Sequence, residues 1–448
     1  MNELKTLFTD LYELTMVDVY RREAMADRTA IFSLFVRRLP SERGYLVAAG
    51  LDDGLSWLEQ MRFEPEDLAA LDQLGLFPDE FLEWLGEMRF TGSVRAVPEG
   101  TIVFAEEPIL EVEAPIGQAQ LAETFLLNQI TLQTTLATKA ARCRDAAGGR
   151  AVVDFALRRT QGIDAGMKLA RICGLVGLSA TSNVAGAARY GVPASGTMAH
   201  AFVQAYGNET EAFRAFAGAY ADATVLVVDT YDTEQGVRNA ITVAREMRER
   251  GIALRGIRLD SGDLGKLAHW ARGRLDEAGL PQVKIFASGG LDEYSIHRLV
   301  EFDKAPIDGF GVGSALGVSA DAPSLDSVYK LVEYDGRMVR KTSTGKAIWP
   351  GSKQVWRGND WGDDVIALAE EPSPGPDYSP LLEPAMIKGS RVGVGERSLV
   401  ENHRHFEEQW RQLLPALRRL IDPDRHPVKI SDRLQQAAVR IDAGRKEG

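Results

Sequence analysis

The chain has 448 residues, 45% of them hydrophobic and 26% charged, which is the composition of a globular protein with room for two or three domains, or for one barrel with additions. Its formal net charge of −12 argues against a broadly basic surface, so we expect no nucleic-acid partner. The two cysteines, Cys143 and Cys173, are too few for a disulfide framework or a four-thiolate zinc site. No apolar run reaches the roughly 18 residues of a membrane helix, and the N-terminus lacks a signal-peptide pattern, so we expect a cytoplasmic protein without a membrane partner.

Residues 1–117 mix the two kinds of secondary structure. A helical start is followed by the β-rich run "TAIFSLFV", two helical segments and two short strand patterns with proline and glycine turns. This order predicts an N-terminal α+β domain. From residue 118 to about 147, apolar side chains recur on one helical face and Gly148 and Gly149 end the pattern, so we expect a long helix that leads into the next domain.

After the long helix, the remainder of residues 118–325 shows a regular alternation of strand and helix patterns. About seven short apolar runs are each followed by polar or glycine-rich residues and then by helical sequence; they include "AVVDFALRR", "VPASGTMAH" and "IDGFGVGSAL". This alternation predicts an irregular TIM-like α/β barrel, in which the chemistry lies at the carboxyl ends of the strands.

Strand patterns return in residues 326–448, beginning with "SVYKLVEYDGRMVRKTS". A proline-rich stretch follows, and then the amphipathic helix pattern "FEEQWRQLLPALRRLI". We expect this segment to complete the α+β domain that the N-terminal residues begin, and to end in a helical tail.

Two glycine-rich turns follow the last two predicted barrel strands. "FASGGLDE" contains Gly289 and Gly290, and "GFGVGSAL" contains Gly313 and Ser314. Glycine lets backbone N–H groups approach an anion closely, and the last two strand–helix loops of many such barrels bind phosphate. Neither turn has the spacing of a dinucleotide fingerprint or a Walker loop. Together the turns predict a phosphate site.

Charged residues cluster at other predicted strand ends. "RLDSGDL" contains Arg258, Asp260 and Asp263, and "VDTYDT" contains Asp229. An aspartate at a strand end can accept ribose hydroxyls, and an arginine can hold a phosphate or carboxylate through two contacts. The alternative is that these residues form a helix N-cap and a structural ion pair.

The first predicted barrel strand ends in "DFALRRTQG", with Phe155 followed by the arginine pair at positions 158 and 159. An aromatic ring beside arginines suits an aromatic acid that carries or receives a phosphate. The alternative is an ordinary solvated arginine pair.

His200 differs from the other histidines in its surroundings. The residues just before it, "SGTMA", are mostly small, which leaves room for a large anionic ligand beside the imidazole. His269 and His297 lie in helical sequence, and we interpret His403 and His405 in "HRH" as surface residues. No nucleophile-elbow signature is present.

Taken in order, these motifs resemble the nicotinate phosphoribosyltransferase family. The resemblance runs through most of the chain, in the motifs "FTDLYELTM", "FVRRLPSERGYLVAAGL", "QLAETFLLNQI", "ATKAAR", "DFALRRTQGIDAG", "ATSNVAG", "SGTMAHAFV", "VDTYDT", "IRLDSGDL", "FASGGLDE", "GFGVGS", "VYKLVEYDGRMVRK" and "PGSKQVWR". It implies ATP-assisted transfer of phosphoribosyl from phosphoribosyl pyrophosphate to nicotinate, in NAD biosynthesis and salvage. It also implies the type II phosphoribosyltransferase fold and a homodimer whose active sites share residues.

The resemblance also implies roles for single residues. His200 corresponds to the histidine that ATP phosphorylates, and Arg258 and Asp260 to residues of the reaction centre. The implied contacts with nicotinate come from Tyr12 of the neighbouring subunit, Phe155, Ser182, Thr197 and Arg258. Those with the phosphoribosyl group come from Arg158, Asp229, Asp260, Gly289, Gly290, Gly313 and Ser314.

Mg²⁺ is the implied cofactor, bound mainly by pyrophosphate oxygens, so we assign no protein ligand to it. Some family members carry a cysteine-rich zinc site near the carboxyl end; because this chain has no cysteine after Cys173, we expect no zinc. At Ser182 the nicotinamide-using relatives have an aspartate, which would repel nicotinate, so the serine favours the acid. The alternatives are a phosphoribosyltransferase for nicotinamide or quinolinate and a catalytically silent binding protein.

Overall fold

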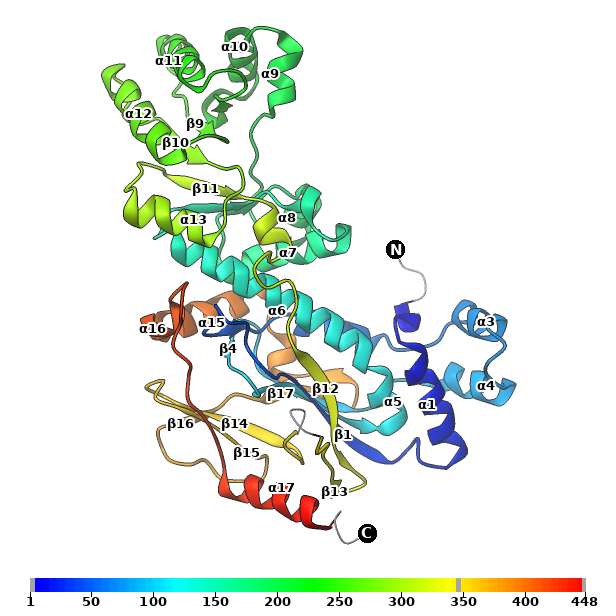
Figure 1. Ribbon diagram of the computed structural model, residues 1–448. Helices are drawn as coiled ribbons and strands as arrows, with labels where there is room; N and C mark the ends of the chain where they lie inside the picture. The colour runs from blue at the N-terminus through cyan, green and yellow to red at the C-terminus, as the bar shows by residue number, and fades with distance from the viewer. Residues whose placement is uncertain (1–4, 344–347, 445–448) are drawn as a thin grey trace. The chain divides into compact units, whose positions relative to one another are not determined.

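The computed structural model describes residues 5–343 and 348–444 of the chain. It divides into two compact units (Figure 1). Unit 1 is built from Met1–Thr138 and Ser324–Gly448, and unit 2 from Lys139–Pro323. Both ends of the chain therefore belong to one unit, and the middle of the chain forms the other.

The division falls inside the long helix α6 (Glu123–Ala146). Its first half belongs to unit 1 because its hydroxyl groups hold that unit's backbone: Thr134 accepts from the N–H of Ala49 at 3.2 Å, and Thr138 from that of Val47 at 2.9 Å. The sequence pattern predicts a barrel domain that begins at residue 118 and includes the whole helix, whereas the compact unit 2 begins at Lys139. The boundary within the helix cannot be predicted from the hydrophobic pattern, because that pattern does not reflect side-chain hydrogen bonds of this kind.

Unit 1 contains a seven-stranded sheet in the order β13-β12-β1-β5-β3-β17-β18. The predicted strand at "TAIFSLFV" is β1 (Thr29–Val36), which pairs antiparallel with β5 (Pro108–Pro115) on one side and β12 (Ser327–Tyr334) on the other. All but its first residue are buried. The other strands of this sheet are β3 (Ser93–Ala96), β13 (Arg337–Met338), β17 (Glu383–Ile387) and β18 (Ser390–Arg391).

Smaller sheets and helices complete unit 1. A four-stranded sheet has the order β16-β14-β15-β19, and β2 pairs with β4. These strands are β2 (Leu46–Val47), β4 (Ile102–Val103), β14 (Lys353–Gly358), β15 (Asp364–Leu368), β16 (Tyr378–Pro380) and β19 (Val428–Ile430). The helices are α1 (Leu11–Arg22), α2 (Leu51–Glu59), α3 (Pro65–Gln73), α4 (Asp79–Glu87), α5 (Ile116–Leu121), α15 (Leu399–Gln412), α16 (Pro415–Arg418) and α17 (Asp432–Gly444), with short turns η1 (Lys5–Leu7) and η5 (Gly393–Glu396).

Unit 2 is a six-stranded parallel sheet in the order β7-β6-β11-β10-β9-β8. Figure 1 shows its helices gathered around these strands. The strands are β6 (Ala151–Asp154), β7 (Ala180–Thr181), β8 (Val225–Val227), β9 (Gly256–Leu259), β10 (Lys284–Ala287) and β11 (Gly309–Val312). The helices are α7 (Ile163–Val176), α8 (Val184–Tyr190), α9 (His200–Tyr206), α10 (Glu209–Tyr220), α11 (Thr233–Glu249), α12 (Leu264–Glu277), α13 (Glu293–His297) and α14 (Ser314–Gly317). The short 3₁₀ helices are η2 (Leu157–Arg159) and η3 (Ala221–Ala223), and η4 (Arg298–Phe302) is a π-helix directly after α13.

The predicted alternation of parallel strands and helices is confirmed, but a closed barrel is not. In the described residues, β7 and β8 are the edge strands of the sheet, so the fold is a mixed α/β fold with a half-barrel sheet. One expected strand, in "VPASGTMAH", does not form. It contributes a single bridge, between Ala194 and Thr181, because its proline, glycine and small residues cannot sustain a buried strand.

No helix in the described part of the chain has both the length and the apolar composition that a membrane span requires.

Candidate functional site

The carboxyl edge of the unit 2 sheet gathers the residues that the sequence singled out. Parallel strands end at the same edge, so the residues that follow them lie side by side. Asp229 comes after β8, Asp260 after β9 and Phe155 after β6. Ser182 follows β7, and Gly313 follows β11. This edge, rather than any one motif, defines the site.

Arg258 and Asp260 form the centre of the site. Arg258 is the third residue of β9, only 9% exposed, and its Nη1 donates to Asp260 Oδ1 at 3.0 Å. Burial lowers the pKa of the Arg258 guanidinium, although the carboxylates of Asp260 and Asp229 oppose the shift. A guanidinium remains charged under such a shift, so the site keeps a fixed, poorly hydrated cation.

Ser288, immediately after β10, joins this pair. Its hydroxyl donates to Asp260 Oδ1 and accepts from Arg258 Nη1 at 3.2 Å. Burial by itself would raise the pKa of Asp260, but the Ser288 hydrogen bond and the charge of Arg258 lower it below its ordinary value. Asp260 is therefore a carboxylate held in place by two donors. Ser288 does not stand out in the sequence, because one serine beside two glycines carries no distinctive pattern.

His200 begins α9 and reaches the same carboxylate. Its Nε2 lies 3.4 Å from Asp260 Oδ2, and its Nδ1 lies 3.2 Å from the Thr230 hydroxyl. A carboxylate can only accept, so Nε2 carries the proton in this arrangement and Nδ1 can present a lone pair toward the hydroxyl. The side chain is 38% exposed, which leaves the imidazole reachable from solvent. Thr230 is a second contact that the sequence did not reveal.

Asp229 holds the loop after β9. Its Oδ2 accepts from the backbone N–H of Asp260 at 3.2 Å and from the Ser261 hydroxyl at 2.5 Å. Its other oxygen, Oδ1, is buried and has no hydrogen-bond partner among the described residues. An unpaired buried carboxylate oxygen costs free energy unless a ligand, a water or a cation meets it.

The glycines differ in what they allow. Gly289 has φ +91°, and a Cβ there would lie 1.8 Å from the carbonyl oxygen of Asp260, so another residue cannot occupy the position without a backbone shift. Gly290 has φ +69° but open space around it. Gly313 precedes the short helix α14, whose first residue, Ser314, is exposed. Gly311, not selected from the sequence, accommodates the Phe155 ring, 2.4 Å from where a Cβ would be.

Other predicted residues lie around this centre. Phe155 is half-buried and Arg158 is exposed. Burial is the main cause that lowers the pKa of Arg258, the carboxylates of Asp260 and Asp229 oppose it, and the nearby charge of Arg158 adds to the lowering. The Thr197 hydroxyl donates to the carbonyl of Met198 at 3.1 Å, and the same carbonyl accepts from Arg258 Nη2 at 3.1 Å. The loop before His200 is thereby attached to the central arginine.

Two conspicuous aspartates have structural roles instead. Asp263 is the N-cap of α12, accepting from the Lys266 N–H at 3.2 Å, which is the alternative considered for this motif. Asp154 is buried and accepts from Thr181 Oγ1 at 2.6 Å and from the N–H of Ala156 at 2.7 Å. Burial raises the pKa of the Asp154 carboxyl.

Tyr12 belongs to unit 1, where it lies on α1 with 46% of its surface exposed. Partial burial and the nearby carboxylates of Glu123 and Glu13 raise the pKa of its hydroxyl. The half-buried Ser182 belongs to unit 2, where its backbone N–H donates to the Asp154 carbonyl at 2.8 Å. The structure thus brings Arg258, Asp260, Asp229 and His200 together and describes Tyr12 within the other unit.

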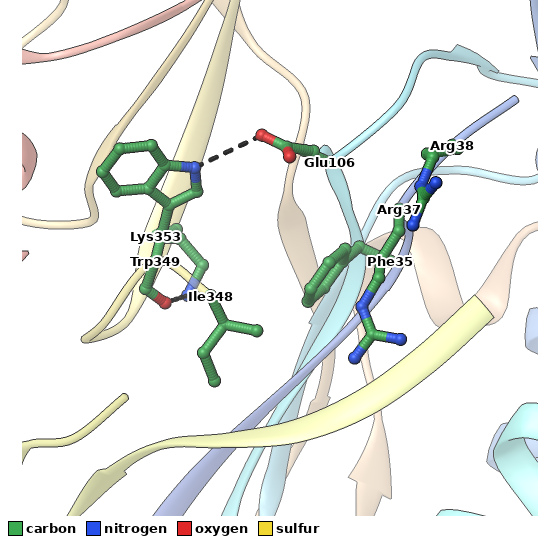
Figure 2. Close-up of a pocket in the computed structure, with 7 residues that line it drawn as sticks. All are labelled: Phe35, Arg37, Arg38, Glu106, Ile348, Trp349 and Lys353. Carbon is green, nitrogen blue, oxygen red and sulfur yellow. Dashed lines mark hydrogen bonds between the residues drawn. The ribbon is translucent and has the colours of Figure 1, made fainter. Parts of the chain in front are cut away.

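Unit 1 has a cavity of about 340 Å³ of its own (Figure 2). Its lining carries three basic side chains against one acidic one, and Trp349 Nε1 donates to Glu106 Oε2 at 3.4 Å. Each of these basic side chains also has a carboxylate beside it: Arg37 Nη1 lies 3.5 Å and Arg38 Nε 3.9 Å from Asp326, and Lys353 Nζ lies 3.3 Å from Glu111. The lining residues are Phe35, Arg37, Arg38, Glu106, Ile348, Trp349 and Lys353.

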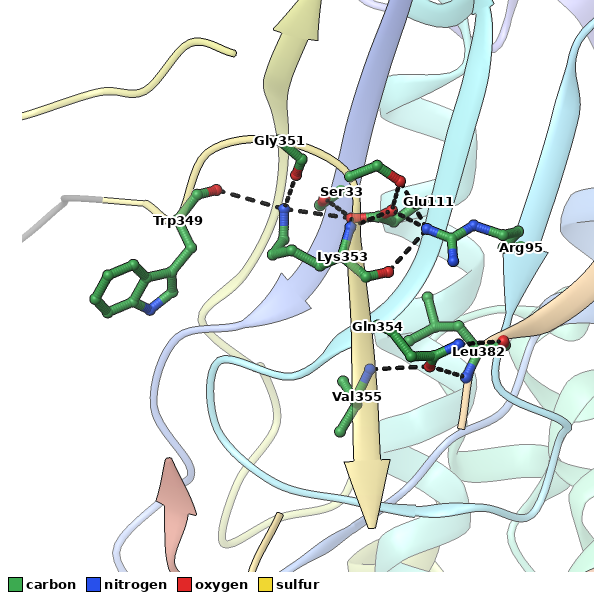
Figure 3. Close-up of polar contacts among 10 residues, drawn as sticks. Ser33, Arg95, Glu111, Trp349, Gly351, Lys353, Gln354, Val355 and Leu382 are labelled. Atoms are coloured by element: carbon green, nitrogen blue, oxygen red, sulfur yellow. Dashed lines mark hydrogen bonds and ion pairs between the residues drawn. The ribbon is translucent and has the colours of Figure 1, made fainter. Parts of the chain in front are cut away.

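Lys353, in this lining, is held by a buried ion cluster (Figure 3). Glu111 on β5 accepts from Arg95 Nη2 at 2.7 Å and from the Ser33 hydroxyl at 2.6 Å, and it lies 3.3 Å from Lys353 Nζ. Burial would raise the pKa of Glu111, but the charges of Lys353 and Arg95 lower it. The cluster joins β14 to strands β1, β3 and β5.

No group of three or more histidine, cysteine, aspartate or glutamate side chains within residues 5–343 and 348–444 is arranged to hold a metal ion.

A half-barrel of parallel strands with an arginine, carboxylates and a reachable imidazole at its carboxyl edge defines an α/β enzyme that acts on small-molecule substrates. Family models for nicotinate phosphoribosyltransferase match three segments: the N-terminal domain model residues 7–131, the family model residues 151–349 and the C-terminal domain model residues 375–438. The chain belongs to the nicotinate phosphoribosyltransferase family.

Individual relatives agree with this assignment. Nicotinate phosphoribosyltransferase pncB2 of Mycobacterium tuberculosis is 50% identical over 439 residues, which are 97% of this chain and 93% of the relative. The Bacillus subtilis nicotinate phosphoribosyltransferase is 46% identical over 82% of this chain and 76% of its own. The crystal structure of human nicotinic acid phosphoribosyltransferase superimposes with a TM-score of 0.84 at 29% identity, covering 97% of this chain and 99% of that one.

Proposed function

We propose that this chain is the enzyme that transfers phosphoribosyl from phosphoribosyl pyrophosphate to the ring nitrogen of nicotinate, giving nicotinate mononucleotide and pyrophosphate in NAD biosynthesis. The observation that carries the proposal is the Arg258–Asp260–Ser288 cluster at the carboxyl edge of the sheet, in a chain of this family.

The reaction needs little from the protein beyond position and charge. Breaking the bond between the anomeric carbon and pyrophosphate develops positive charge on the ribose ring, and the pyridine nitrogen is the nucleophile, so no side chain has to attack. Asp260 and Asp229 are carboxylates suited to the ribose hydroxyls and to the developing positive charge. The backbone N–H of Asp260 holds the Asp229 carboxylate, and the Ser288 hydroxyl holds the Asp260 carboxylate. Both groups are therefore fixed before the substrate arrives, which lowers the reorganisation that the reaction requires.

Nicotinate is a flat acid, and the proposed site offers it an aromatic face and hydrogen-bond donors. Phe155 and, from a second subunit, Tyr12 would lie on the two faces of the ring. Arg258 and the hydroxyls of Ser182 and Thr197 would meet the carboxylate. The glycines at positions 289, 290 and 313, with Ser314 and Arg158, would hold the 5′-phosphate through backbone N–H groups, a hydroxyl and a guanidinium.

Mg²⁺ fits this site as an ion that arrives with pyrophosphate. Asp229 Oδ1, buried and without a partner, is the donor in the described residues that is best prepared to meet it. When bound, Mg²⁺ would supply positive charge to the leaving pyrophosphate oxygens. We propose no zinc site.

ATP coupling would pass through His200. Nδ1 of the imidazole would attack the γ-phosphorus of ATP, the bond from that phosphorus to ADP would break, and water would later release the phosphate. Gly196, with open space around it, and the exposed Ala199 leave room for the phosphates before the helix. Asp260 would hold the proton on Nε2 and so direct the reaction to Nδ1.

We propose that the active form is a cytoplasmic homodimer, in which the half-barrel sheet forms part of an irregular barrel and each site receives Tyr12 from the partner. The test is an assay with radiolabelled nicotinate, phosphoribosyl pyrophosphate and Mg²⁺, with and without ATP. We expect nicotinate mononucleotide in both cases and more of it with ATP. Preference for nicotinamide or quinolinate would replace this function with that of the related enzymes, and no product from any base would indicate a binding protein.

His200→Ala tests the ATP step separately. Incubation of the unmodified protein with γ-labelled ATP should leave an acid-labile phosphate on the chain, and the variant should not carry it. Comparing the ATP-independent rates of the two proteins measures separately what the imidazole contributes to the transfer through its contact with Asp260. Equal labelling of both proteins would refute the phosphohistidine.

A further inference from the structure

A buried ion cluster in unit 2 lies outside the proposed reaction centre. Lys139 and Arg142 on α6 both contact Glu293, the first residue of α13: Arg142 Nε donates to Glu293 Oε1 at 2.9 Å, and Lys139 Nζ is paired with Glu293 Oε2. The three side chains are 1%, 1% and 0% exposed. Lys139 also pairs with Asp321 at 2.6 Å.

Such a cluster is a costly way to connect two helices. Each charge loses its hydration on burial, and an apolar contact of the same volume would commonly stabilise the fold at least as well. The ion pairs instead define a position, because a carboxylate between two cations has one favoured place, whereas aliphatic side chains can pack together in several ways. The cluster therefore fixes where α13 begins more than it adds to stability.

The start of α13 is also the end of the glycine turn. Asp292 caps the helix, with reciprocal hydrogen bonds of 2.8 Å to Ser295. Four residues earlier, Ser288 contacts Asp260 and Arg258, and Gly289 packs against the Asp260 carbonyl so closely that no Cβ fits. The turn is thus held at one end by the reaction centre and at the other by Glu293.

We propose that Lys139, Arg142 and Glu293 are positioning residues: they fix the turn of residues 288–291 in the place where it binds the 5′-phosphate of phosphoribosyl pyrophosphate. This inference rests on the proposed function, which gives the turn its ligand. It assigns to α6 a role in substrate affinity although these three residues do not touch the substrate.

Glu293→Gln tests the proposal, because it keeps the shape of the side chain and removes the charge. We expect the KM for phosphoribosyl pyrophosphate to rise about tenfold, because both cations lose the charge that fixes the start of α13, with kcat and the KM for nicotinate within about twofold. Asp321→Asn is the matched control. It removes the other carboxylate partner of Lys139 and leaves α13 in contact with both cations, so it should lower the melting temperature without changing either KM.

Gly289→Ala separates this inference from the proposed function. If the turn binds phosphate, the alanine should raise the KM for phosphoribosyl pyrophosphate by itself. A raised KM in Gly289→Ala with an unchanged KM in Glu293→Gln would overturn the positioning role and leave the function intact. An unchanged KM in both variants would remove the phosphate site as well. Should Glu293→Gln fail to fold, Lys139→Gln takes its place; because it retains the Arg142–Glu293 contact, we expect a smaller rise in the same KM, and no rise at all would overturn the positioning role.

Discussion

Ser288 shows how much of the site depends on one hydroxyl. It bridges Asp260 and Arg258, and it is 2% exposed, so water cannot replace it freely. Ser288→Ala should lower kcat/KM for phosphoribosyl pyrophosphate by about 10- to 100-fold, corresponding to the ~1–3 kcal/mol that an unsatisfied buried partner costs. Steady-state kinetics measure this, with the exposed Ser373→Ala as a control that should match the unmodified enzyme.

The same variant should change the pH dependence in a defined direction. The Ser288 hydrogen bond is the largest influence that lowers the pKa of Asp260 against burial, so its loss raises that pKa. Because the site needs Asp260 as a carboxylate, the acid limb of the kcat/KM profile should move to higher pH in Ser288→Ala. An unmoved acid limb would mean that another group controls it.

Ser182 is the residue at which the choice between acid and amide can be tested. Its side chain is half-buried at the end of β7. In Ser182→Asp the new carboxylate would face the carboxylate of nicotinate. Because like charges at close range cost about 1 kcal/mol or more, kcat/KM for nicotinate should fall at least about fivefold. Turnover of nicotinamide should fall less. Ser182→Asn, with similar bulk and no charge, is the control; an equal loss for both bases in the aspartate variant would contradict the assignment.

The residues that sequence reasoning found and missed differ in kind. Arg258, Asp260 and Asp229 could be predicted because charged residues directly after apolar strand runs are unusual and parallel strands end together. Ser288, Thr230 and Gly311 could not, because small and hydroxyl residues are common at every turn. Their roles come from three-dimensional proximity to the charged pair and to Phe155.

At the scale of elements, the strand pattern was reliable where β-branched residues dominate. β8, β9 and β10 were all expected, and their neighbours in the sheet follow from their parallel direction. The prediction of a strand in residues 192–200 is wrong. The small apolar residues of this run match the hydropathy pattern of a strand, but their side chains are too small to pack as those of a buried strand do. The opening of the sheet between β7 and β8 follows from that missing strand.

The helix α15 corrects another expectation. His405 is not a surface residue: it is partly buried and lies 2.9 Å from the Thr101 hydroxyl. Burial, assisted by the charges of Arg397 and Arg357, lowers the pKa of His405 to about 4. The burial of His405 is not evident from the sequence, because its neighbours are polar and an amphipathic helix can bury one residue of a polar run while it exposes the next.

This shift makes unit 1 less stable in acid. An unfolded histidine has a pKa of about 6.5, so between about pH 6.5 and 4 the unfolded chain binds a proton that folded His405 does not. Stability is therefore full above the unfolded pKa and is lost as the pH falls toward 4, by up to about 3 kcal/mol. Calorimetric melting temperatures at pH 7 and 4.5 should differ less in His405→Gln than in the unmodified protein. His269→Gln, at an exposed histidine, should leave the difference unchanged.

For the whole molecule, the sequence indicated that both chain ends contribute sheet-like elements but not how they interleave. β12, from beyond the unit 2 segment, pairs with β1, and β17 pairs with β3. Pairings between strands some 300 residues apart depend on register and on buried clusters such as that of Glu111, none of which a single sequence displays. The three family models follow the chain order, whereas the compact units do not.

The proposed dimer can be tested by mixing two inactive variants. Tyr12→Ala damages a residue of unit 1, and Arg258→Ala damages the centre of the unit 2 site. If each site takes Tyr12 from the partner, a mixed dimer contains one intact site, and random exchange of equal amounts should restore about a quarter of the activity. If each chain uses its own Tyr12, every site in the mixture keeps one defect. Mixing Arg258→Ala with Asp260→Ala is the control, because both changes lie in one unit and no arrangement of subunits repairs them.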